Sequence, residues 1–148
     1  SARYNENSKF TDKSTLQVTS KEILKDLENL GCVSNKSDKL IFPIIDNKYK
    51  HHFMRGYFDG DGSAFITNQK ILRFSIISTK EFCESFLTEL PYNGKSKVSK
   101  DKRYDKNVYY IQIGGVNIIK PIYQFLYKDA TIFLKRKKDI FDRFYINL

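Results

Sequence analysis

The chain has 148 residues, of which 41% are hydrophobic and 15% aromatic, and its formal net charge is +9. This length suits one domain with its own core, and the hydrophobic share excludes a disordered chain. The charge indicates a polyanionic partner, with nucleic acid ahead of an acidic membrane.

Targeting and redox signals are few. No stretch approaches the ~18 apolar residues of a membrane span, and the N-terminus has no apolar signal region. Cys32 and Cys83 lack the paired spacing of a zinc site, so they predict free thiols in a reducing compartment. We therefore expect a soluble, intracellular protein with no membrane partner, cytoplasmic in a prokaryote or located in an organelle.

The N-terminal part predicts a strand followed by a helix. Residues 14–19 alternate between polar and apolar, which is typical of a strand. Ser20 is an expected helix N-cap, and apolar residues at helical spacing lead from it to Gly31, an expected helix end. An extended segment then ends at Pro43.

A second helix is expected to begin near Asn47 and to continue to Phe58. The sequence Asp59-Gly60-Asp61-Gly62 should stop it, because two glycines there lose too much backbone entropy. The macrodipole disfavours each aspartate at a helix C-terminus by roughly 0.3–1 kcal/mol unless a cation, such as a divalent metal, neutralises it.

The remaining chain predicts two β-hairpins and three helices. The hairpins pair residues 63–67 with 71–77, and residues 95–100 with 108–113. A helix capped by Ser78 or Thr79 lies between them and ends before Pro91, and two more helices span 117–127 and 130–144. From the helix near Asn47 onward, the expected order is α-β-β-α-β-β-α-α.

The chain also shows an internal correspondence at a spacing of 95 residues. This shift sets Gln17-Val18 on Gln112-Ile113 and the helix after Ser20 on the helix over 117–127. A shift of 59 residues, which sets Ser20 on Thr79, is the alternative; we prefer 95 because it also aligns the polar segments 1–12 and 96–107. Residues 1–45 are then the C-terminal part of a first repeat, and residues 46–148 are a complete second repeat.

The stretch 53–63 resembles the signature of the LAGLIDADG homing endonucleases. Nine residues, 54–62, lie over the name motif, with both glycines and both aspartates identical and apolar residues at three further places. Arg55 and Gly60 replace its alanines. A calcium loop of the EF-hand type is the other interpretation, but counting from Asp59 its required glycine and glutamate positions hold Ala64 and Lys70.

The resemblance implies an α+β fold in which an antiparallel β saddle packs under helices, with αββαββαα repeats. It also implies a metal-dependent endonuclease that hydrolyses phosphodiester bonds in a long, specific double-stranded DNA site, encoded in an intron or an intein or standing alone. A non-cleaving DNA- or intron-RNA-binding protein of the same fold, a regulator or maturase, is the alternative. A further alternative is a purely structural protein whose basic face contacts a membrane or the ribosome.

The same resemblance implies roles for individual residues. Asp61 and the main-chain carbonyl of Gly60 would hold Mg²⁺ or another divalent cation, and Lys137 and Lys36 would be the catalytic lysines. For the basic run around Lys137, a solvated face or a phosphate clamp is the alternative. Gly56 and Gly60, four residues apart, leave one helix face bare for a second signature helix. That helix would come from a missing N-terminal piece or from another chain, and we favour the piece.

The predicted strands have one polar, basic face that suits the major groove of double-stranded DNA. Alternation places Arg73, Ser75 and Gln112 opposite apolar neighbours, whereas Lys95 and Lys97 share one strand face. An ordinary solvated sheet face is the alternative. The expected DNA-binding residues are Arg73, Ser75, Lys95, Lys97, Lys100, Lys102, Arg103 and Gln112.

Overall fold

The computed structural model describes residues 17, 19–31, 39–104 and 106–145. The polar segment 1–12 and Lys36 lie outside these residues, and so does most of the strand expected over 14–19. The elements are α1 (Lys21–Asn29), α2 (Asn47–Asp61), β1 (Ser63–Ile66), β2 (Leu72–Ser78), α3 (Lys80–Glu89), β3 (Ser99–Lys100), β4 (Tyr109–Gly114), α4 (Val116–Tyr127) and α5 (Lys135–Tyr145). From α2 onward their order is the one that the sequence predicts.

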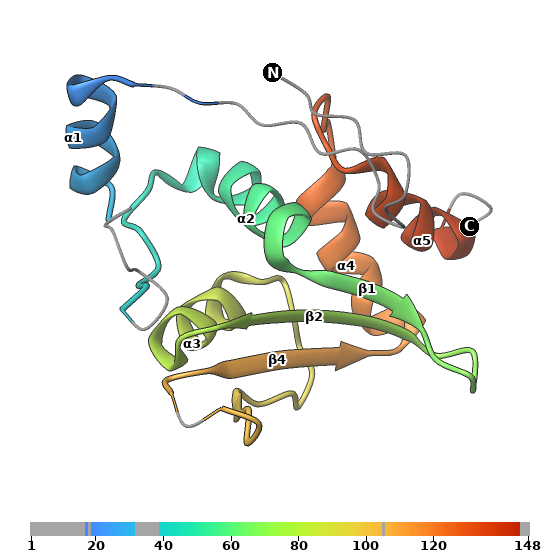
Figure 1. Cartoon of the computed structure of the whole chain (residues 1–148). Coiled ribbons are helices and arrows are strands. Elements are labelled where there is room, and N and C mark those ends of the chain that lie inside the picture. Colours follow the sequence, from blue (N-terminus) through green and yellow to red (C-terminus); the bar gives the residue numbers. More distant parts are fainter. Residues whose placement is uncertain (1–16, 18, 32–38, 105, 146–148) are drawn as a thin grey trace, which may run out of the picture.

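The centre of the molecule is a four-stranded antiparallel sheet with strand order β1-β2-β4-β3. Figure 1 shows its three longer strands, β1, β2 and β4, side by side. Residues alternate between its two faces, as strand geometry requires. Phe74, for example, lies opposite Ala64 on β1 and Ile113 on β4, and all three are buried. Helices α2 to α5 contact the sheet and cover this inner face with their own apolar residues.

Aromatic packing joins the signature helix to the sheet. The ring of Phe58 on α2 stacks on Phe74 at a centroid distance of 4.5 Å, and Tyr57 packs on Phe82 of α3 at 4.3 Å. Fully buried side chains extend this core: Met54, Phe82, Phe86, Ile119, Ile122, Leu126 and Phe141. The end of α2 is therefore fixed relative to β1 and β2, the strands that follow it.

Two expected caps are confirmed. Ser20 accepts a hydrogen bond from the amide of Ile23 at 3.3 Å, and Thr79 accepts one from the amide of Phe82 at 3.2 Å. Gly31 follows α1 with φ of 84°, the left-handed conformation that suits a glycine after a helix.

The expected end of α2 at Phe58 is wrong, because the helix continues to Asp61 and ends at the cap Gly62. The ammonium group of Lys137 donates hydrogen bonds to the main-chain carbonyls of Phe58, Asp59 and the cap Gly62, and so offsets the weak helix propensity of Gly60.

The strand expected over 95–100 is wrong in length, because β3 contains only Ser99–Lys100. The amide of Ser96 donates to the Tyr92 hydroxyl at 2.7 Å, so it does not join the ladder with β4. Lys95 and Lys97 therefore do not share a strand face, although both are exposed.

The last helix begins at Lys135 rather than at residue 130. Two main-chain groups of the preceding segment have tertiary partners: the amide of Leu134 donates to Asp59, and the carbonyl of Ile132 accepts from Arg55. These bonds hold residues 130–134 in an irregular conformation beside α2.

Helix α1 stands apart from the two-layer body (Figure 1) and buries none of its residues. Its apolar side chains are 43–60% exposed; they are Ile23, Leu24 and Leu27, with Leu30 at the helix end. None of the helices in the described ranges is long and apolar enough to cross a bilayer.

Candidate active site and nucleic-acid interface

The signature helix α2 has one buried and one open face. Met54, Arg55 and Phe58 are buried, whereas Gly56 and Gly60 are exposed. A Cβ atom added to either glycine would meet nothing within 4 Å in the described part of the chain. The two glycines that were predicted to pair with another helix therefore lie together on an open face.

The two aspartates of the motif have different environments. Asp59 accepts hydrogen bonds from the Tyr127 hydroxyl at 2.7 Å and from the amide of Leu134 at 2.9 Å, so it connects α2 with α4 and with the segment before α5. Burial and then this hydrogen bond raise the pKa of Tyr127. Asp61, in contrast, is exposed at the last position of the helix. Asp59 is half-buried and engaged in these bonds, whereas Asp61 is the more accessible of the two carboxylates.

Lys137 lies beneath the end of α2 and is only 2% exposed. Its ammonium group donates to the carbonyls of Phe58 at 2.6 Å, of Asp59 at 2.8 Å, and of Gly62. Burial and the nearby Arg136 lower the pKa of Lys137, and the carboxylates of Asp59 and Asp61 oppose this effect. The residue predicted as catalytic is thus placed against the main chain that carries Asp61.

The end of α2 carries oxygen donors of the kind that Mg²⁺ prefers. Asp61 supplies one exposed carboxylate, and the adjacent Gly60 supplies a main-chain carbonyl. No group of three or more His, Cys, Asp or Glu residues lies together in the described ranges. Mg²⁺ commonly binds through one or two carboxylates together with water and substrate phosphates, so this donor set fits it.

Arg55 has a structural role that sequence reasoning missed. Its guanidinium donates to the carbonyls of Leu126 and Ile132, each at 3.0 Å, and lies 2.9 Å from Nδ1 of His52. Arg55 is only 8% exposed, and these bonds satisfy the donors of its buried charged group. They also join α2 to α4 and to the segment before α5. The available signal was a charged residue at an alanine position of the motif.

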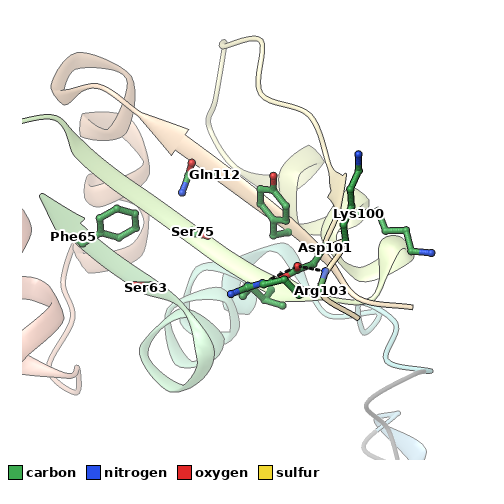
Figure 2. A pocket seen from close by; sticks show the side chains of 10 residues that line it. Ser63, Phe65, Ser75, Lys100, Asp101, Arg103 and Gln112 are labelled. Atoms are coloured by element: carbon green, nitrogen blue, oxygen red, sulfur yellow. Dashed lines mark hydrogen bonds and ion pairs between the residues drawn. The ribbon is translucent and has the colours of Figure 1, made fainter. Parts of the chain in front are cut away.

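The outer face of the sheet, away from the helices, carries a cleft of about 710 Å³ (Figure 2). Ser63, Ser75 and Gln112 lie opposite one another across β1, β2 and β4, and all three line it. The other lining residues are Phe65, Ile77, Lys100, Asp101, Lys102, Arg103 and Tyr110.

The structure brings most of the expected DNA-binding residues to this outer face. Ser75, Lys100, Lys102, Arg103 and Gln112 line the cleft. Arg73 lies on the same sheet face, since its side chain covers Gly114, its partner in the ladder with β4. Lys95 and Lys97 are the exceptions, because they lie outside the strands and do not line the cleft.

The fold is similar to a solved structure described as an archaeal intron-encoded homing endonuclease, I-Vdi141I, complexed with DNA. The TM-score is 0.52 with 20% sequence identity, over 66% of this chain and 67% of that one. The chain has the LAGLIDADG homing-endonuclease fold. No protein-family model and no curated protein sequence matches the chain.

Two further LAGLIDADG-type structures are similar at lower TM-scores. The homing endonuclease I-TnaI gives 0.47 with 20% identity, over 64% of this chain and 69% of that one. The LAGLIDADG homing endonuclease I-SmaMI bound to cleaved DNA gives 0.47 with 23% identity, over 87% of this chain and 44% of that one. The chain therefore spans less than half the length of I-SmaMI.

Proposed function

We propose that the chain is part of a homing endonuclease that hydrolyses phosphodiester bonds in a specific double-stranded DNA site. The observation that supports this most directly is the position of Asp61. This exposed carboxylate lies two residues before Ser63, where the outer sheet face begins, so their Cα atoms are at most ~7 Å apart. DNA lying on that face would have phosphates next to Asp61.

In this proposal, Asp61 and the carbonyl of Gly60 hold Mg²⁺ or another divalent cation. The cation, when bound, supplies Lewis-acid polarisation of a phosphate oxygen. Lys137 donates to the main-chain carbonyls of Asp59 and Gly62, before and after Asp61 in the chain, and thereby holds the backbone that carries its carboxylate. Lys36, outside the described residues, remains the predicted catalytic lysine of a first repeat.

DNA binding by the outer sheet face is supported by charge and by shape. The chain carries a net charge of +9, and phosphate neutralisation by lysine and arginine dominates protein–DNA affinity. The cleft combines Lys100 and Lys102 with polar side chains such as Gln112. I-Vdi141I, which has a similar fold, is described in complex with DNA.

A second signature helix is part of the proposal, because Gly56 and Gly60 leave α2 with an open face. Helices α1 and α4 begin at residues 21 and 116, which are 95 positions apart as the repeat predicts. Under this shift, Leu24 and Leu27 correspond to Ile119 and Ile122, which are fully buried on α4.

The exposed face of α1 is then the face that a first sheet and signature helix would cover. This supports residues 1–45 as the end of a first repeat and 46–148 as a second one. We favour an N-terminal piece as the source of the partner helix over a second copy of this chain.

The test is cleavage of a randomised duplex library by the unaltered chain and by Asp61→Asn, with Mg²⁺. We expect Asp61→Asn to cut more than 100-fold more slowly, a loss of at least about 2.7 kcal/mol in the barrier, because the amide loses the charge that holds the cation. Binding to duplex DNA without divalent metal should be retained. Asp139→Asn, a carboxylate paired with Lys135 on the surface of α5, is the control that should cut normally.

Two results would contradict the proposal. Cutting by Asp61→Asn above about 1% of the normal rate would remove Asp61 from the site. Salt-dependent duplex or RNA binding by an unaltered chain that nicks neither strand, even when a second signature helix is supplied, would instead favour the non-cleaving regulator or maturase.

A further inference from the structure

A buried carboxylate holds one arginine rigidly at the edge of the outer cleft. The side chain of Asp101 is 6% exposed, whereas that of its partner Arg103 is 72% exposed. The guanidinium donates from Nε to Oδ1 at 2.9 Å and from Nη2 to Oδ2 at 2.6 Å (Figure 2). These hydrogen bonds lower the pKa of the Asp101 carboxyl, so the carboxylate stays ionised.

The guanidinium of Arg103 is not the only group that ties the loop between β3 and β4. The amide of Asp101 donates to the carbonyl of Val108 at 2.9 Å, and the amide of Arg103 donates to Oδ1 of Asp101 at 3.1 Å. Neither of these two bonds uses the guanidinium, so the loop has main-chain ties besides the ion pair. The ion pair also fixes the orientation of the arginine side chain at the cleft.

The geometry leaves the adjacent edge of the guanidinium, formed by Nη1 and the second Nη2 hydrogen, unoccupied by Asp101. Two parallel N–H groups on one edge match the O6 and N7 acceptors of guanine in the major groove. An arginine that is already held in place loses less conformational entropy on binding than a free one. Lys100 and Lys102 in the same cleft are flexible point charges and lack this fork.

We propose that Arg103, held by Asp101, is a guanine-reading residue that sets base specificity at one position of the DNA site. This inference rests on the proposed DNA-binding function and deepens it. Asp101 is a positioning residue, since it contacts the arginine and not the base. In contrast to Arg103, Lys102 would contribute to affinity but not to specificity, because a lysine that contacts a phosphate attracts DNA without distinguishing its bases.

The test measures base preference at every position by selecting bound duplexes from a randomised library, with the full chain and three variants. Arg103→Lys keeps the charge but removes the fork, and it should lower the preference for guanine at one position by about tenfold or more. Asp101→Asn retains an oxygen that can accept the amide of Arg103, and it should weaken the same preference. Circular dichroism establishes that both variants are folded.

Lys102→Ala is the matched control. It should reduce affinity for all sequences to a similar extent and flatten the salt dependence, while the guanine preference stays unchanged. Duplex binding in which Arg103→Lys keeps every base preference of the unaltered chain would overturn this inference alone. Absence of duplex binding by the unaltered chain would overturn the proposed function and this inference with it.

Discussion

Replacing Lys137 by methionine tests whether this buried lysine stabilises the end of the signature helix. Methionine keeps most of the side-chain volume but removes the donors to Phe58, Asp59 and Gly62. The Phe58 carbonyl still accepts a hydrogen bond from the amide of Gly62 at 2.8 Å. The carbonyls of Asp59 and Gly62 lose the lysine and have no such second bond in the described part of the chain to replace it. These two carbonyls are part-buried, so each costs an amount toward the lower end of ~1–3 kcal/mol, and relief of the buried ammonium offsets part of this.

We therefore expect Lys137→Met to lower the free energy of unfolding by about 1–3 kcal/mol, measured by urea denaturation. The matched control is Lys135→Met on the same helix. The side chain of Lys135 is 81% exposed and pairs with Asp139 across one helical turn, so its loss should cost only ~0.5 kcal/mol. Because Asp61 lies between the held peptide groups, Lys137→Met should also weaken Mg²⁺ binding, measured by calorimetry.

Equal unfolding free energies for the two methionine variants, within ~0.5 kcal/mol, would refute the stabilising role. Loss of cutting by Lys137→Met with an unchanged unfolding free energy and unchanged Mg²⁺ affinity would instead support the catalytic role that the family resemblance implies.

The remaining predictions concern two glycines and a thiol. Gly56→Ala should raise the free energy of unfolding by ~0.5–1 kcal/mol, because the added methyl meets open space on a helix. Gly62→Ala should lower the free energy of unfolding, because the new Cβ would lie 2.3 Å from the ring of Phe58. Gly56→Leu should leave the fold intact but prevent helix pairing; an unchanged assembly state in sedimentation would show that this face is no interface. In a Cys32→Ser background, the free thiol of Cys83 should resist a thiol reagent at about pH 8 until the chain unfolds, because burial raises its pKa to about 12. Since the folded chain holds that proton more tightly than the unfolded one, stability should fall as the pH rises between 9 and about 12, and a rise in urea midpoint there would contradict this.

Local signals in the sequence determined most of the elements. The N-cap side chains fix where α1 and α3 begin. Ser20 and Thr79 each accept a hydrogen bond from the backbone amide three residues later in the chain. Alternation along β2 determined which residues face the core, because a side chain on a strand has only two directions. The open glycine face of α2 and the exposed Asp61 at its end follow from the motif itself.

Contacts between distant residues decided what the sequence alone did not. Helix α2 reaches Asp61 because Lys137, 79 positions beyond Phe58, bonds its last carbonyls. Helix α5 starts late because Asp59 and Arg55 bind the main chain before it. Intrinsic propensities differ by only about 1 kcal/mol per residue, and a buried hydrogen bond to a charged group contributes ~1.5–3 kcal/mol. Tertiary hydrogen bonds therefore set the ends of these helices and separate the structural Asp59 from the exposed Asp61.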